Sequence, residues 1–155
     1  MRNHVTVLIA GLLILTPSMA MAAVCKLENA TFRPKYAAEH FEIRSSRVDG
    51  VPGFGVTVRK TNETFRFRVD ADRGTGAGTI TSVPDAAGQD PRIRTNYQLL
   101  DGKGLKTTPA GEVGHVSFLD LGRAFVDSRM RTSRNVEPYT SPPSGLWHVT
   151  DCRLK

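Results

Sequence analysis

The sequence predicts an all-β protein: a single small domain folded as a seven- or eight-stranded antiparallel barrel or sandwich, with its termini tied by a disulfide. From Ala30 onward, short runs of β-branched and aromatic residues are separated by Gly, Pro, Asn and Asp. This composition is typical of short strands joined by turns. The spacing of apolar residues suits a helix in only one longer stretch. No linker or repeat divides the chain, so we expect one domain over residues 23–155.

Seven segments read as strands, at about 41–48, 54–60, 64–70, 78–83, 93–100, 113–119 and 146–152, and a first strand at 26–32 fits as well. The clearest segment is 64–69. Its strict alternation places Phe65, Phe67 and Val69 on one face and two arginines on the other. Thr61, Asn62 and Glu63 supply a tight connection from the preceding strand. The sequence therefore predicts a hairpin over residues 54–70.

Two stretches fit helical structure better than a strand. Residues 119–131 repeat apolar side chains at near-helical spacing, which predicts one short helix, although Gly122 counts against it. Residues 36–40 follow Pro34 and fit a single helical turn.

The N-terminus has the features of a signal peptide. Arg2 precedes an apolar run from Val5 to Leu15, and Ala20-Met21-Ala22 supplies small residues for cleavage. The run is too short for a membrane-spanning helix, which needs about 20 apolar residues. We expect cleavage after Ala22, with Ala20 or Ala23 as neighbouring alternatives, and a periplasmic or secreted product.

Cys25 and Cys152 are the two cysteines of the chain. In an oxidising compartment such a pair predicts a structural disulfide that ties the termini together. A loop of this size gives a stabilisation of about 4–5 kcal/mol in the chain-entropy model. Redox catalysts use closely spaced cysteines, so a redox role is disfavoured.

The chain is basic, with a formal net charge of +6. Removing residues 1–22 takes away Arg2 and no acid, which leaves +5 and a surface that attracts anions. Residues 70–74 lack the ligands of a calcium loop, and residues 74–78 match no nucleotide-binding fingerprint. We therefore expect no cofactor and no metal.

Arginines recur two residues apart around an apolar residue in three places. On a strand, this spacing sends both guanidinium groups to one face. Arg66 with Arg68, and Arg92 with Arg94, therefore predict a cationic sheet face able to grip phosphates or carboxylates, with Arg44, Arg59 or Arg73 as potential neighbours. The third pair, Arg129 and Arg131, falls in the predicted helix, where its side chains diverge. The alternative is an ordinary solvated polar face.

The loop at 138–147 is the second candidate binding element. Pro142 and Pro143 restrict it, and Tyr139, Ser144 and Trp147 give it the composition of a rigid recognition loop. Alternatively, Trp147 anchors the core and the prolines stiffen a turn.

The function predicted from these features is an exported, non-enzymatic binding protein of the cell envelope. Its expected partner is an anionic envelope component or an acidic protein. Specific nucleic-acid binding is not expected, because the aromatic residues beside Arg66 and Arg68 face the core. The alternative is a small metal-independent hydrolase that uses His115 or His148 as a base beside Ser117 or Ser144, although no nucleophile motif accompanies them.

Overall fold

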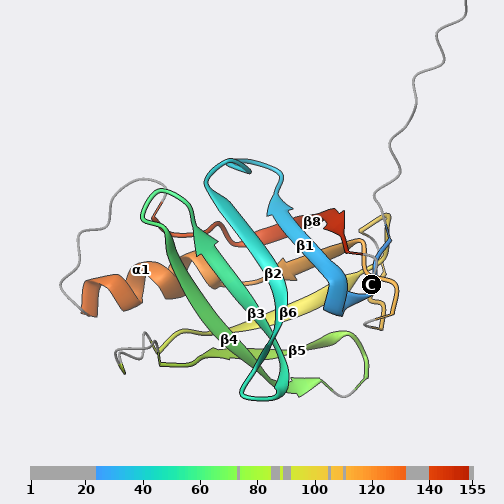
Figure 1. The fold of residues 1–155 in the computed structure, drawn as a ribbon, viewed down its shortest axis with the longest axis horizontal. Coiled ribbons are helices and arrows are strands. Elements are labelled where there is room, and N and C mark those ends of the chain that lie inside the picture. The colour runs from blue at the N-terminus through green and yellow to red at the C-terminus, as the bar shows by residue number, and fades with distance from the viewer. Residues whose placement is uncertain are drawn as a thin grey trace, which may run out of the picture.

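A computed structural model of the chain describes residues 24–72, 74–84, 88, 92–104, 106–109, 111–131 and 140–153. The predicted signal segment, residues 1–22, lies outside the described residues, as does Arg73. The described part of the chain forms a short 3-10 helix, eight strands and one α-helix (Figure 1). In chain order these are η1 (Leu27–Asn29), β1 (Ala30–Pro34), β2 (Phe41–Val48), β3 (Val51–Val58), β4 (Glu63–Asp72), β5 (Ala77–Ser82), β6 (Arg94–Leu100), β7 (His115–Phe118), α1 (Leu121–Arg131) and β8 (Gly145–Cys152).

The strands close into an antiparallel barrel in which each strand pairs with the next one along the chain. β1 closes the ring by pairing with β8, where Ala30 lies opposite Cys152. The register of the hairpin from β3 to β4 places Phe54 opposite Phe67. The barrel therefore confirms the predicted all-β fold. Because the ring of strands is closed, the fold is a barrel rather than a sandwich.

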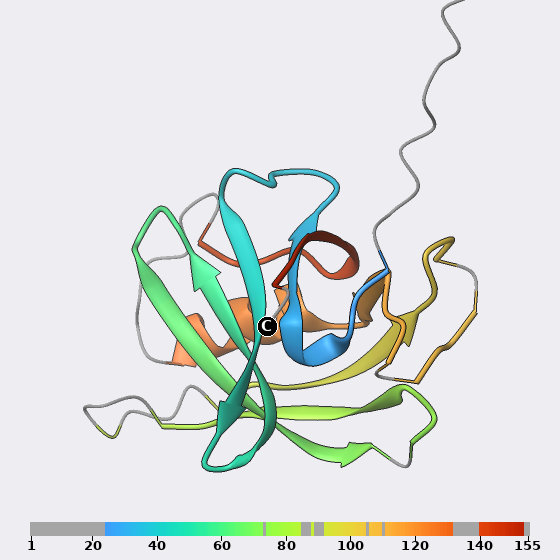
Figure 2. The ribbon, with the colours of Figure 1, turned by 45° about the vertical axis from the view of Figure 1, so that its right-hand side comes forward.

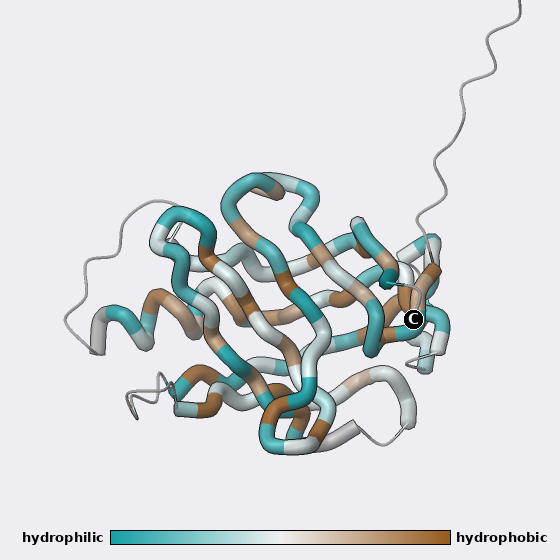
Figure 3. Tube along the Cα trace, viewed as in Figure 1, coloured by the Kyte–Doolittle hydropathy of each residue, from teal (hydrophilic) through white to brown (hydrophobic). Residues whose placement is uncertain are grey.

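Alternating side chains fill the barrel interior. Hydrophilic and hydrophobic residues alternate along the strands (Figure 3). The hydrophobic side chains that face inward form one core cluster. Phe32, Phe54, Phe67 and Trp147 are all fully buried there. The ring of Phe54 meets the ring of Phe118 edge-on, with centroids 5.9 Å apart. The centre of the barrel is thus packed with aromatic and branched side chains rather than open to a ligand.

Helix α1 covers the end of the barrel at which β4 begins. Phe125 is buried against Phe65 and Phe67 of β4, with ring centroids 4.8 and 6.1 Å apart. Arg129 donates a hydrogen bond of 2.7 Å to Glu63 at the start of β4. The predicted helix at 119–131 is confirmed, and its apolar stripe is the face that seals the barrel.

The opposite end of the barrel holds both ends of the described chain, near Cys25 and Cys152. The disulfide joins Cys25 to Cys152, across a sequence separation of 127 residues. Figure 1 shows that β8 ends on the side of the barrel away from α1, and Figure 2 shows the blue start of the described chain beside the dark red end of β8. Cys25 also exchanges two backbone hydrogen bonds with Val113. The predicted disulfide is therefore confirmed. It ties the first residues of the described chain to the end of β8 at this end of the barrel.

Some boundaries differ from those predicted. β3 begins at Val51 rather than Phe54, because Asp49 and Gly50 both have positive φ and form a two-residue hairpin turn. Residues 27–29 form η1, so the first strand starts at Ala30 and continues through Pro34. Residues 36–40 form a turn, closed by a hydrogen bond from His40 N–H to the Ala37 carbonyl, rather than a helix.

Candidate functional site

Arginines gather on the outer side of the barrel. Because side chains alternate along a strand, the residues between the core positions of β1 to β6 point outward. Six of these outward residues, or residues directly after a strand, are arginines, and we call this surface the arginine face. They are Arg33 on β1, Arg44 on β2, Arg59 after β3, Arg66 and Arg68 on β4, and Arg94 on β6.

The pairing register joins these arginines into rows across the sheet. Arg44 and Arg66 each lie opposite Gly55 of the strand between them. Their Cα atoms are therefore about 10 Å apart, two strand spacings. Gly55 contributes no side chain to the space between them, and a Cβ built there would meet nothing closer than 3.7 Å. A phosphate or carboxylate that approaches the sheet at this point meets no side chain from residue 55.

A second row contains Arg68 and Arg94. Both lie opposite Thr81 of β5, one on each side. Asp70 accepts hydrogen bonds from the Thr81 hydroxyl and from Arg68 Nε, the latter at 3.1 Å. These two bonds and the charges of Arg68 and Arg94 lower the pKa of Asp70, against a smaller opposing effect of burial. The register thus brings Arg66, Arg68 and Arg94 to one face.

A buried carboxylate organises the other side of the arginine face. Glu42 is only 5% exposed, and its carboxylate accepts hydrogen bonds from Arg33, Arg44 and Arg59 at 2.9, 2.5 and 2.8 Å. Burial raises the pKa of Glu42, but the three guanidinium hydrogen bonds together outweigh it and hold the pKa below its usual value. Three cations around one anion keep a net positive charge and fixed guanidinium positions.

On the strands themselves, the described outward side chains include five arginines and two carboxylates, Glu42 and Asp70, and Arg59 follows β3 directly. The excess on the strands is three positive charges. Arg92 lies two residues before β6 and is exposed, with a positive φ of 53°. The alternation of β6 therefore does not extend to Arg92.

In the described part of the predicted recognition loop, residues 140–147, Ser144 and Trp147 have contacts within the fold. Tyr139 lies outside the described residues. Ser144 Oγ accepts a hydrogen bond of 3.0 Å from the Gly122 N–H in the first turn of α1, which is a capping contact. Trp147 is fully buried, its ring meets that of Phe118 edge-on, and its indole N–H donates to the Pro143 carbonyl. Ser144 and Trp147 therefore have structural partners.

Two histidines face each other across β7 and β8. The rings of His115 and His148 lie 4.8 Å apart in an edge-on arrangement. His115 Nδ1 is 2.8 Å from the Asp101 carbonyl, which only accepts, so Nδ1 carries the proton of the neutral ring. Burial, with the charges of His115 and Lys35, lowers the pKa of His148.

Comparison of the chain with protein-family models, with curated proteins and with solved structures gives no significant match. Within the described residues, no helix is long and apolar enough to cross a membrane. In the same residues, no cluster of three or more His, Cys, Asp or Glu side chains is placed to hold a metal ion.

Sequence reasoning missed the Glu42 cluster. Alternation in Phe41-Glu42-Ile43 already indicates that Glu42 points away from the core. What the sequence does not contain is the register that brings Arg33 and Arg59 onto the same carboxylate.

Proposed function

We propose that this protein is a non-enzymatic binding module that engages a polyanionic partner through the arginine face. The observation that carries the proposal is the excess of three positive charges among the outward strand side chains, with guanidinium groups held by Glu42 and Asp70. Arginine is suited to this role because its planar fork binds phosphates and carboxylates through paired hydrogen bonds.

The filled interior supports binding from outside rather than inside the barrel. Phe32, Phe54 and Trp147 occupy its centre without exposure, so a large ligand would have to displace the core. The spacing of the arginines, one or two strands apart, suits a partner with repeated charges about 5–10 Å apart. A phosphorylated or carboxylated envelope polymer and an acidic protein surface both have this property.

We also propose that the protein is exported from the cytoplasm. The disulfide between Cys25 and Cys152 is typical of oxidising compartments, and residues 1–22 retain the features of a signal peptide. A periplasmic or secreted location would give the arginine face access to anionic envelope components.

The hydrolase alternative receives less support from the geometry. Ser144 Oγ is engaged by the Gly122 N–H, and the described residues contain no hydrogen bond between either Ser117 or Ser144 and His115 or His148. Nucleophilic catalysis requires a base within hydrogen-bond reach of the nucleophile. We therefore favour binding over catalysis.

Affinity capture tests the proposal. The purified protein is immobilised and exposed to envelope extract at low and at high salt, and retained material is identified by mass spectrometry. We expect anionic material that is held at low salt and released at high salt, since screening weakens exposed charge pairs.

The matched control separates the arginine face from net charge. The double variant Arg66→Ser/Arg68→Ser should lose this capture, whereas Arg123→Ser/Arg153→Ser, with the same change in charge at residues outside the arginine face, should keep it. Equal loss in both variants, or retention that is indifferent to salt, would refute the proposal.

A further inference from the structure

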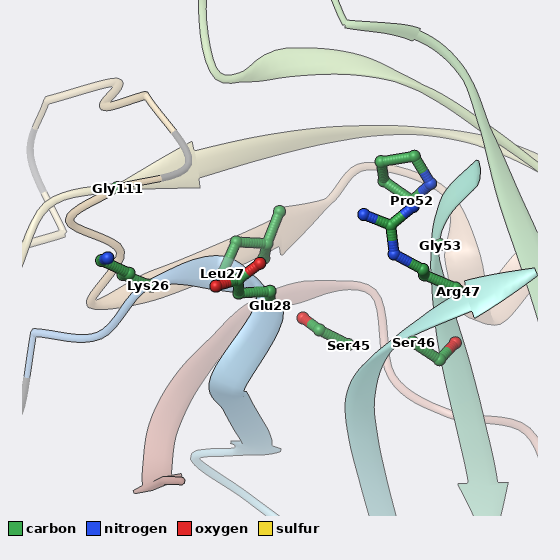
Figure 4. A pocket seen from close by; sticks show the side chains of 9 residues that line it. All are labelled: Lys26, Leu27, Glu28, Ser45, Ser46, Arg47, Pro52, Gly53 and Gly111. Carbon is green, nitrogen blue, oxygen red and sulfur yellow. The ribbon is translucent and has the colours of Figure 1, made fainter. Parts of the chain in front are cut away.

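A pocket of about 530 Å³ opens at the end of the barrel opposite α1, and we call it the mouth pocket. Figure 4 shows its two walls, with η1 on one side and the hairpin of β2 and β3 on the other. It is lined by Lys26, Leu27, Glu28, Ser45, Ser46, Arg47, Pro52, Gly53 and Gly111. Its volume lies within the range of about 300–1,000 Å³ found for small-molecule sites, which also recur in the mouths of β-barrels.

The walls of the mouth pocket are held in place before any ligand binds. The disulfide and the backbone hydrogen bonds between Cys25 and Val113 fix the strand end beside Lys26 and Gly111. The facing hairpin is paired along its whole length, from Phe41 with Val58 to Val48 with Val51. A preformed site binds without the entropy cost of ordering its walls.

The chemistry of the lining combines an apolar body with positive charge. Leu27 and Pro52 supply apolar surface, and Lys26 and Arg47 outnumber the single acid, Glu28. Arg47 extends from the hairpin toward η1 (Figure 4). It uses Nη1 for a hydrogen bond of 2.9 Å to the Gly50 carbonyl, which leaves other guanidinium donors for an anion.

Ser45 gives an independent indication of a ligand. Its strand position has the parity of Phe41 and Ile43, which face the core, and its side chain lines the mouth pocket. Ser45 Oγ is buried, and among the described residues it makes no hydrogen bond. Buried polar groups are normally paired, and rotation about the Cα–Cβ bond of Ser45 would bring this hydroxyl to a ligand in the mouth pocket.

From these observations we infer that the mouth pocket binds a small monoanion with an apolar body, such as a medium-chain carboxylate. Arg47 and Lys26 would receive the charged head, Ser45 would hydrogen-bond to it, and Leu27 and Pro52 would contact the chain. This site is separate from the arginine face and does not depend on the proposed function.

The test is a titration of the ¹⁵N-labelled protein with octanoate, followed by amide chemical shifts, beside matched titrations with 1-octanol and octylammonium. We expect saturable shifts confined to residues 26–28, 45–47, 53 and 111, from octanoate and not from octylammonium, with 1-octanol weaker. Arg47→Gln should weaken octanoate binding about tenfold, the size expected for one charge-assisted hydrogen bond. Ser45→Val should weaken it similarly, because it removes the hydroxyl and fills the space.

Arg66→Ser/Arg68→Ser should leave octanoate binding unchanged, so that this inference and the proposed function fail separately. The inference is overturned if octanoate does not bind, if all three probes bind equally, if the shifts fall on the arginine face, or if Arg47→Gln binds octanoate as tightly as the unmodified protein.

Discussion

Two carboxylates on the outside of the same barrel, Glu42 and Asp70, bind arginines in different ways. The Glu42 side chain is 6% exposed and is held by three guanidinium groups, whereas the Asp70 side chain is 26% exposed and is held by Arg68 and a threonine. A charge that is removed from water depends on its partners for stability, and an exposed pair contributes little. From this comparison we expect the arginines around Glu42 to contribute more to the stability of the fold than the arginines around Asp70.

The largest effect is expected at Glu42. Glu42→Gln should lower the free energy of unfolding by about 2 kcal/mol, because it leaves three half-buried guanidinium groups without their anion. Asp70→Asn should lower it by less than about 1 kcal/mol. Chemical denaturation of both variants measures the difference, and equal losses would remove the distinction between the two clusters.

The pH dependence of stability should follow Glu42 as well. Its pKa is lower in the folded protein than its ordinary value of 4.5, so its contribution is complete above that value and is lost as the pH falls through the folded pKa. Thermal unfolding between pH 6 and 3 should show a steeper acid loss for the unmodified protein than for Glu42→Gln. Parallel curves would mean that the carboxylate titrates as it does in the unfolded chain.

An intermediate effect is expected at Gly55, which lies between the two clusters. Gly55→Glu places a carboxylate between Arg44 and Arg66, where a side chain has room. Binding to inorganic polyphosphate should weaken about tenfold through charge repulsion. The control Gly55→Gln introduces the same bulk without charge and should retain most of the affinity. A similar loss in both variants would assign the effect to shape.

A smaller change in the opposite direction is expected from Asp70→Asn. The substitution removes one of the two negative charges of the arginine face, so affinity for polyphosphate should rise about two- to fivefold at low salt. The gain should disappear at high salt, where exposed charges are screened. Isothermal titration at two salt concentrations measures this, and weaker binding at low salt would show that Asp70 positions Arg68 for the partner.

The smallest effect is expected at His148, outside both clusters. Its folded pKa lies below the ordinary 6.5, so the unfolded chain takes up a proton first as the pH falls. Stability should therefore decline slightly as the pH falls below about 6.5, and His148→Gln should flatten this decline. Thermal midpoints at half-unit steps of pH provide the measurement; an unchanged decline would assign it to other groups.

Local patterns were sufficient to predict most of the fold. Alternation at 64–69 indicates which side of β4 is buried, and the apolar spacing at 119–131 predicts α1, because both depend on neighbouring residues alone. Asp49-Gly50 between two apolar runs is a strong hairpin signal that would have placed the start of β3 correctly. The two terminal cysteines predicted the disulfide for reasons of compartment and number rather than geometry.

The candidate site was harder to predict because it depends on register. Arg66 and Arg94 lie 28 positions apart in the sequence, and only the pairing through β5 shows that they share a face. The burial of Glu42 likewise depends on Arg33 and Arg59 from neighbouring strands. For Trp147, composition allowed both a recognition loop and a core anchor, and its depth in the folded core favours the second.

The most direct test of the arginine face is the salt dependence of polyphosphate binding. The slope of log K against log salt reports how many counterions the protein displaces, at nearly one for each neutralised phosphate. We predict that Arg66→Ser/Arg68→Ser reduces the magnitude of this slope by about 1–2, while Arg123→Ser/Arg153→Ser leaves it unchanged. An equal slope for the unmodified protein and Arg66→Ser/Arg68→Ser would contradict the account.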